Sequence, residues 1–232
     1  MKKVGLVYFG SSYFSAIFLE KLLTDSVITQ LIEIKFVVTQ PDRKVGRKQI
    51  LTPTPVKEVA NRYKIPVFEV GSRKREAGQE NGSKKLEKNL TSKFQNLDLA
   101  LVFAYANLIP KELLALPKYG FWCVHPSLLP KYRGTSPMAT ALINGDETTG
   151  VTIFKMDEEI DHGPIIAQEK YTIKETDKRP DLEVKLTDLA FKMFKKLLGE
   201  KSKFFATWDA AEGGGPTGDK KFRYQAFNMI EL

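Results

Sequence analysis

The sequence predicts an α/β protein with a doubly wound, mostly parallel sheet. Short apolar runs bounded by turn residues alternate with segments whose apolar residues recur at helical spacing. The run from Leu97 to Ala104 is apolar throughout, which is typical of a strand buried on both faces. The 232 residues suffice for one large domain with a tail. We expect the domain over residues 1–200 and the tail over 201–232.

The chain opens with a strand, a turn and a helix. Val4 to Phe9 is the strand, serines follow Gly10 as candidate caps, and Tyr13 to Leu23 has helical spacing. Gly10 is the only glycine of this turn, so the G-x-G-x-x-G fingerprint is absent and a dinucleotide site is disfavoured. Ile32 to Thr39 forms the second strand.

Residues 40–57 predict a long loop. Pro41, Gly46, Pro53 and Pro55 forbid regular structure across most of it. Loops of this length in compact domains are usually functional or disordered, and composition alone favours a solvated, mobile loop.

The remaining elements follow the same alternation. Thr54 and Pro55 begin a helix that runs through Tyr63, as N-cap and first helical residue. The other expected segments are a strand at 65–70, an exposed loop at 71–85, helices at 86–94 and 109–116, a strand at 164–173 and an amphipathic helix at 181–198.

Composition narrows the possible functions. The single cysteine excludes an internal disulfide and a multi-cysteine zinc site, and fits a reducing cytoplasm. No apolar run is long enough to cross a bilayer, and Met1-Lys2-Lys3 leads directly into a strand, so we expect a cytoplasmic protein without a signal peptide. The net charge of +8 favours an anionic partner such as nucleic acid.

The stretch from Gly120 to Gly163 carries the candidate chemistry. Phe121 to Val124 reads as a buried strand that delivers His125 to its carboxyl end, where open α/β sheets place ligands. The apolar run Val151 to Met156 leads into acidic residues that end at Asp161, so a carboxylate can reach a similar edge from a neighbouring strand. A histidine and an aspartate that meet there are a plausible general base and its partner. A solvated loop histidine is the alternative.

The order of motifs in this stretch resembles a known family. C-x-H, S-L-L-P-x-x-R-G, T-G-V-T-I and D-x-G follow one another as in the formyltransferases that use 10-formyltetrahydrofolate. The resemblance implies formyl transfer to an amine, with His125, Asp161 and the residue at position 123 as the catalytic group. That residue is asparagine in the family and Cys123 here.

The resemblance also implies a folate site and no metal. The segment that lines the pteridine pocket, largely through backbone groups, corresponds to residues 105–109. The folate-contacting residues carried over in this way are Tyr105, Ala106, Asn107, Leu108, Ile109, Asp157 and Ile160.

Within the family, one loop distinguishes the acceptor. T-Q-P-D-R-x-x-G-R followed by L-x-P-x-P-V-K resembles the loop that methionyl-tRNA formyltransferases place against the tRNA acceptor arm. This implies that methionyl-tRNA is the partner and that formylation serves translation initiation. Arg43 and Arg47 would fork onto phosphates, with Lys44 and Lys48 as point charges. Those enzymes usually carry a second, β-barrel domain, which the residues after 201 are too few to build. An amino sugar nucleotide is the alternative acceptor, because H-P-S-L-L-P-K-Y-R-G fits that branch equally well.

Cys123 admits three interpretations. The site can tolerate a thiol, with the backbone, His125 and water stabilising the oxyanion of a slower enzyme. The protein can instead bind folate or tRNA without catalysis. Finally, a Cys123 thiolate could accept the formyl group covalently, since Cys-x-His places both side chains on one face of a strand.

Overall fold

The computed structural model describes residues 2–71, 91–94 and 96–199. Most of the loop expected at 71–85, the first part of the helix expected at 86–94, and the tail expected at 201–232 lie outside the described residues. The chain divides into two compact units, Met1–Phe121 and Trp122–Leu232.

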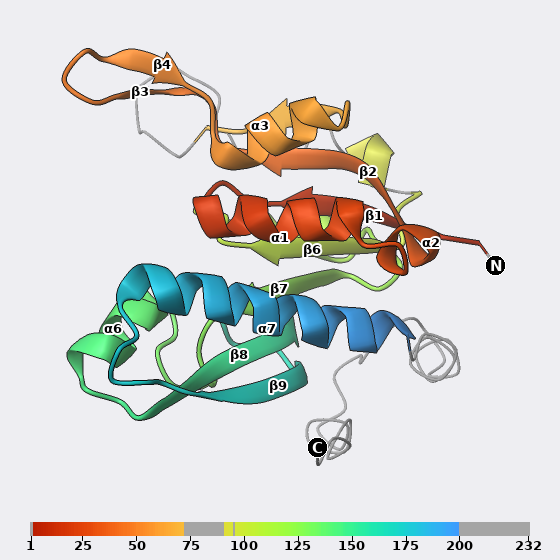
Figure 1. Ribbon diagram of the computed structural model, residues 1–232. Helices are drawn as coiled ribbons and strands as arrows, with labels where there is room; N and C mark the ends of the chain where they lie inside the picture. The colour runs from red at the N-terminus through yellow and green to blue at the C-terminus, as the bar shows by residue number, and fades with distance from the viewer. Residues whose placement is uncertain (1, 72–90, 95, 200–232) are drawn as a thin grey trace. The chain divides into compact units, whose positions relative to one another are not determined.

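The first unit is built on parallel strands in the order β5-β2-β1-β6 (Figure 1). These strands are β1 (Val4–Phe9), β2 (Ile32–Thr39), β5 (Val67–Glu69) and β6 (Leu99–Phe103). Every residue of β1 and β6 is buried, as expected for strands covered on both faces. The predicted α/β class with a mostly parallel sheet is confirmed.

Helices connect these parallel strands, because a parallel pair needs a crossover connection. They are α1 (Tyr13–Thr24), the short α2 (Ile28–Leu31) and α3 (Pro55–Arg62). The Ser12 hydroxyl caps α1 by accepting from the Ser15 N–H, and Thr54 caps α3 by accepting from the Lys57 N–H, as predicted. After β6, α5 (Lys111–Leu114) is shorter than the helix expected at 109–116.

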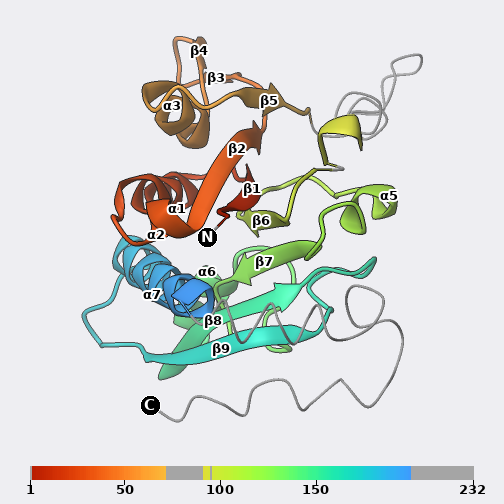
Figure 2. The same ribbon diagram turned by 90° about the vertical axis from the view of Figure 1, so that its right-hand side faces the viewer.

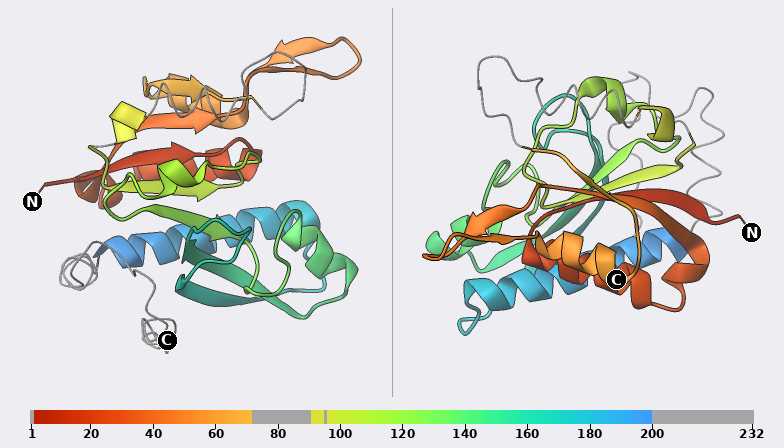
Figure 3. Two further views of the ribbon diagram at one scale, coloured as in Figure 1. Left: turned by 180° about the vertical axis from the view of Figure 1, so that it is seen from behind. Right: turned by 90° about the horizontal axis from the view of Figure 1, so that it is seen from above.

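Residues 40–57 contain a structure that the sequence analysis did not foresee. β3 (Arg43–Val45) pairs with β4 (Ile50–Thr52) in an antiparallel ribbon that projects beyond α3 and β2 (Figures 1 and 3). The prediction that regular structure was forbidden across most of this segment was therefore wrong. Pro41 and Pro53 flank the two strands without interrupting them, and Gly46, with φ +70°, starts the turn that joins them.

As far as residue 199, the second unit combines antiparallel strands with two helices (Figure 2). They are β7 (Phe121–His125), β8 (Thr148–Lys155), β9 (Ile165–Thr172), α6 (Pro137–Ile143) and α7 (Arg179–Gly199). Trp122 is buried and packs edge-on against Phe194 of α7, with ring centroids 6.5 Å apart. The sequence predicted α7 closely and missed α6.

Within its described ranges, the structure contains no helix with the length and apolar character that a membrane span requires.

Candidate active site

His125 is the last residue of β7 and points to the same side of the strand as Cys123. Trp122 and Val124, the residues on either side of Cys123, alternate to the opposite face and are buried. His125 is only 5% exposed, so the imidazole is held among protein groups. The alternative of a solvated loop histidine does not match this burial.

Asp161 reaches His125 by a route that differs from the expected one. β8 runs antiparallel to β7, and its last residue, Lys155, lies opposite Trp122 at the start of β7. The connection from β8 to β9 must therefore turn back to bring Asp161 to the other end of β7. It closes where the Lys155 N–H donates to the Pro164 carbonyl at 2.9 Å. The expected meeting of the two side chains is observed, but a reversed loop produces it.

The two side chains face each other across a short gap. His125 Nδ1 lies 3.6 Å from Asp161 Oδ2, and His125 Nε2 lies 2.9 Å from the Tyr132 carbonyl oxygen. A carbonyl can only accept, so Nε2 carries the hydrogen of this bond. In the neutral imidazole, Nδ1 is then an acceptor, directed to the side where Asp161 lies. Asp161 is fixed in turn by the Gly134 N–H, which donates to Oδ2 at 2.7 Å.

The segment that holds His125 and Asp161 was only partly foreseen. Tyr132 and Gly134 belong to the P-K-Y-R-G turn, and both have positive φ, +59° and +89°. Arg133 lies between these two residues, and the backbone of its two neighbours makes the contacts. The glycine of R-G was the available signal, since glycine is favoured at positive φ.

Thr152 of β8 holds the segment that leads into the same turn. The sequence did not predict this role. Its hydroxyl donates to the Ser127 carbonyl at 2.6 Å and accepts from the Leu129 N–H at 3.1 Å. Gln168 of β9 donates to the same hydroxyl at 2.8 Å. Thr152 is fully buried, so these bonds satisfy a group that would otherwise be costly to bury.

The surroundings of Cys123 favour the thiol over the thiolate. Burial raises the pKa of the Cys123 thiol well above its usual range, and the negative charge of Asp161 raises it further. Reactive cysteines have lowered pKa values, so the raised pKa disfavours the covalent interpretation. A neutral thiol can still act as a weak hydrogen-bond donor.

The residues assigned to folate by resemblance lie in both units. In the first, the Asn107 side chain donates to the Val70 carbonyl at 2.9 Å and lies 3.3 Å from the Tyr105 hydroxyl, while Leu108 is 59% exposed. Ala106 and Ile109 flank Asn107 and Leu108 in this segment. In the second unit, the Asp157 carboxylate accepts from the Glu159 N–H, and Ile160 is 64% exposed.

The second histidine, His162, bonds Asp157 at 2.7 Å. No cluster of three or more acidic, histidine or cysteine side chains suited to a metal ion occurs in the described part of the chain.

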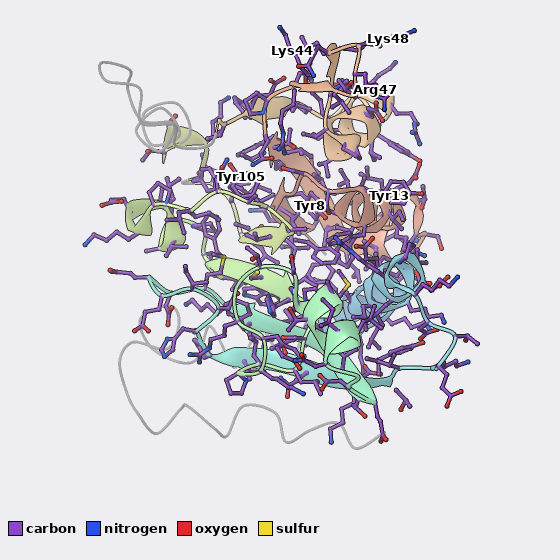
Figure 4. All side chains as sticks on the ribbon, turned by 90° about the vertical axis from the view of Figure 1, so that its left-hand side faces the viewer. Tyr8, Tyr13, Lys44, Arg47, Lys48 and Tyr105 are labelled. Carbon is purple, nitrogen blue, oxygen red and sulfur yellow. The ribbon has the colours of Figure 1, made fainter. Side chains whose placement is uncertain are left out.

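The basic residues of the ribbon are exposed, as Figure 4 shows for Lys44, Arg47 and Lys48. The root of the ribbon is fixed: Lys57 of α3 bonds Asp42 at 2.7 Å and Glu69 at 2.5 Å. These two carboxylates raise the pKa of Lys57. The Arg43 guanidinium donates to the Gln40 side chain, so this arginine is held at the root of the ribbon. Lys44 follows it in β3, and Arg47 and Lys48 lie in the turn between β3 and β4.

A family model described as formyl transferase matches residues 1–198. The chain belongs to this family. A protein named methionyl-tRNA formyltransferase from Caldicellulosiruptor saccharolyticus is 42% identical over 190 residues, which cover 82% of this chain and 57% of that protein. One of the same name from Staphylococcus epidermidis is 40% identical, with 83% and 57% covered. The chain thus spans about 57% of the length of these relatives.

Solved structures of a formyltransferase and of a deformylase share the fold. The phosphoribosylglycinamide formyltransferase of Bacillus halodurans superposes with a TM-score of 0.68 at 26% identity, over 85% of this chain and 94% of that one. The formyltetrahydrofolate deformylase of Pseudomonas syringae pv. tomato gives a TM-score of 0.64 at 17% identity, covering 86% and 62%. The predicted resemblance to formyltransferases is confirmed.

Proposed function

We propose that this chain transfers the formyl group of 10-formyltetrahydrofolate to the amino group of methionyl-tRNA. The observation that carries the proposal is the 42% identity, over 82% of the chain, to a protein named methionyl-tRNA formyltransferase. Formylation of initiator tRNA belongs to translation initiation, and we infer a cytoplasmic location from it. None of the relatives described above is named for an amino sugar acceptor.

The His125–Asp161 pair suits the proton transfers of this reaction. The attacking amine must lose a proton as its nitrogen bonds the formyl carbon, and N10 of the folate must gain one as its bond to that carbon breaks. In this proposal Nδ1 of the neutral His125 accepts the amine proton and then returns it to N10. Asp161, 3.6 Å away, and the Tyr132 carbonyl at Nε2 stabilise the transient imidazolium.

The oxyanion of the tetrahedral intermediate needs a donor. Cys123 lies on the face of β7 that carries His125, and its raised pKa keeps the S–H in place at neutral pH. A thiol donates weakly, so this chain is expected to be slower than one with asparagine at that position. His125 in its protonated form can supply a second donor.

The folate donor requires apolar side chains against its ring and polar groups that fix its orientation. Leu108 exposes a large apolar side chain, the kind of surface that a pterin ring covers. The residues proposed to bind it remain those of the 105–109 segment with Asp157 and Ile160.

The acceptor is proposed to bind through the β3–β4 ribbon. Lys44, Arg47 and Lys48 are exposed, and the structure gives them no ion-pair partner among the described residues. Phosphate contacts from such side chains supply most of the affinity for RNA without reading its sequence.

The test is a formyl-transfer assay with purified chain, 10-formyltetrahydrofolate and three acceptors: methionyl-tRNA, an amino sugar nucleotide and glycinamide ribonucleotide. We expect transfer to methionyl-tRNA alone. The variants His125→Ala and Asp161→Asn should lower its rate by about 10²–10⁴-fold. The control is Glu175→Gln, an exposed residue between β9 and α7 that has no proposed contact with either substrate.

Transfer to the amino sugar nucleotide instead would replace the proposed acceptor. Folate binding without transfer to any acceptor would support a binding protein, the interpretation in which Cys123 marks lost catalysis. Unchanged rates in both His125→Ala and Asp161→Asn would overturn the proposed catalytic roles.

A further inference from the structure

Tyr132 supplies the carbonyl that fixes His125, and its own backbone has an uncommon conformation. The carbonyl oxygen lies 2.9 Å from His125 Nε2. The φ angle of Tyr132 is +59°, in the left-handed region that residues with a Cβ seldom adopt. Such a conformation persists only where the surroundings hold the residue in place. The contacts of the Tyr132 side chain therefore bear on the position of the carbonyl.

The tip of the Tyr132 side chain is held by two polar groups. Its hydroxyl donates to Asp146 Oδ2 at 2.7 Å and accepts from the Asn144 side-chain amide at 2.8 Å. The Lys131 ammonium donates to the same Asp146 oxygen at 2.8 Å. These bonds, first that of Lys131 and then that of Tyr132, lower the pKa of Asp146, so its side chain is a carboxylate that accepts from both.

The end of α6 fixes both partners of the Tyr132 hydroxyl. The Gly145 N–H donates to the Leu142 carbonyl at 3.2 Å, and the Asp146 N–H donates to the Ala141 carbonyl at 3.0 Å. This pair of bonds is the Schellman motif, and Gly145 has the positive φ, +65°, that the motif requires. Asn144 and Asp146 flank that glycine, so the motif that ends the helix also places their side chains.

We propose that Asp146 is a positioning residue for His125 and acts through Tyr132. The contacts run from the Asp146 carboxylate to the Tyr132 hydroxyl, and from the Tyr132 carbonyl to His125 Nε2. Held in this way, the carbonyl keeps the hydrogen on Nε2 and leaves Nδ1, on the side of Asp161, as the acceptor. The effect on catalysis rests on the proposed function, whereas the effect on the imidazole does not.

The first measurement observes the His125 ring without any substrate. Nuclear magnetic resonance of isotope-labelled histidine nitrogens reports which nitrogen carries the hydrogen. At alkaline pH, where the ring is neutral, we expect the hydrogen of His125 on Nε2. Tyr132→Phe removes the hydroxyl but keeps the ring, and Asp146→Ala removes its acceptor. Both should move the His125 signals toward those of a ring that exchanges between two tautomers. The only other histidine, His162, is an internal reference.

The second measurement is the rate of formyl transfer. Tyr132→Phe and Asp146→Ala should each lower kcat by about ten-fold, with little change in KM for the folate donor, since neither residue has a proposed contact with it. A displacement of about 1 Å can cost roughly 10²-fold, and a smaller loss is expected because the Ser127 hydroxyl still holds the Lys131 carbonyl. Asp146→Asn keeps an oxygen that can accept from Tyr132 and should restore most of the rate.

The matched control is Lys131→Met. It removes the other bond to the Asp146 carboxylate, from a side chain that is 54% exposed. Exposed ion pairs contribute little, so both measurements should match wild type. Loss of rate in Lys131→Met equal to that in Tyr132→Phe would overturn the proposal, because the ion pair would then position the ring.

The remaining outcomes separate this proposal from the proposed function. If Tyr132→Phe and Asp146→Ala lower the stability of the fold but leave the His125 signals and kcat unchanged, Asp146 is structural only and the proposal is wrong. If Asp146→Ala does not fold, Tyr132→Phe and Asp146→Asn decide the question, since each keeps the size of the side chain. If wild type transfers formyl to no acceptor, yet the His125 signals change in Tyr132→Phe, the proposed function fails and the positioning stands.

Discussion

Cys123 stands at the position where the resemblance to formyltransferases implies an asparagine. Asparagine donates a strong N–H bond, whereas a thiol donates weakly, and loss of one oxyanion donor typically costs about 10²–10³ in rate. We therefore expect Cys123→Asn to raise kcat toward methionyl-tRNA by roughly 10²-fold. Cys123→Ala should change it only a few-fold. Steady-state kinetics of the three proteins measure both effects.

A different pattern would show that the thiol matters more than proposed. If Cys123→Ala abolishes transfer as completely as His125→Ala does, the sulfur has an essential role. If Cys123→Asn has no more activity than wild type, the oxyanion relies on other donors.

Thr149 and Thr152 lie in the same strand and should respond in opposite ways to the same substitution. Both are buried, at 3% and 0% exposed, but the Thr149 hydroxyl has no hydrogen-bond partner among the described residues, whereas Thr152 makes three bonds. Thr149→Val should stabilise the fold by about 1 kcal/mol. Thr152→Val should destabilise it by about 1–3 kcal/mol, since it leaves partners unsatisfied.

Urea unfolding of the two variants measures this difference. Thr152→Val should also lower the rate of formyl transfer, because Thr152 anchors the turn whose Tyr132 carbonyl orients His125. A destabilised Thr149→Val would mean that its hydroxyl is satisfied in solution.

At the scale of elements, the β8–β9 connection positions Asp161, and Gly163 allows it to close. A Cβ at Gly163 would lie 1.7 Å from the Lys155 carbonyl oxygen, so any side chain must push the connection away from β8. Gly163→Ala should lower the rate by about 10²-fold, the cost of a displacement near 1 Å at a catalytic group. Gly199→Ala is the control, since nothing lies within 4 Å of a Cβ there. Equal activity of the two variants would show that the connection does not set the position of Asp161.

The connection between β9 and α7 depends on a buried carboxylate. Asp177 accepts hydrogen bonds from the Lys185 ammonium, the Tyr171 hydroxyl at 2.9 Å and the Lys174 N–H at 3.2 Å. The Lys185 bond, with help from the other two, lowers the Asp177 pKa below its ordinary 3.8. A lowered pKa contributes stability that is fully present above the unfolded value and is lost as pH falls through the folded one.

We therefore expect Asp177→Asn to be less stable than wild type at neutral pH. This gap should narrow as pH falls below 3.8, the ordinary value for the carboxyl. Urea unfolding at several pH values measures it, with the exposed Glu175→Gln in the same connection as control. A gap that does not change with pH would mean that the carboxylate's charge contributes nothing.

The spacing of apolar residues predicted individual helices and strands better than it predicted how the strands pair. The spacing in α7 and the apolar runs of β1 and β6 follow from local sequence, and the structure matches them. The antiparallel direction of β8 against β7 does not follow from local sequence, because Val151 to Met156 has the same apolar pattern in either orientation. The ribbon was missed because prolines were weighed as interruptions, while their actual positions flank β3 and β4. Tyr132 contributes a carbonyl, and backbone contacts of that kind leave no signature in residue type.

At the scale of the whole molecule, the basic side chains differ in whether they form ion pairs. The net charge is +8, yet many cations are engaged: Lys57 with Asp42 and Glu69, Arg62 with Glu20, and Lys131 with Asp146. The ribbon cations differ, since the described residues give Lys44, Arg47 and Lys48 no such partner. Excess charge that is unpaired and gathered on one projecting element is the arrangement expected for phosphate binding.

This distribution predicts how RNA binding depends on salt. Each phosphate contact steepens the slope of log K against log salt concentration by about 0.7–0.9, so replacing Lys44, Arg47 and Lys48 together by alanine should flatten the slope by about 2–3. Replacing Arg62 and Arg179, which are paired with Glu20 and Glu183, should leave it nearly unchanged. Fluorescence anisotropy of labelled methionyl-tRNA over a range of salt measures the slopes. If the two sets of variants flatten the slope equally, affinity comes from total charge and the ribbon has no special role.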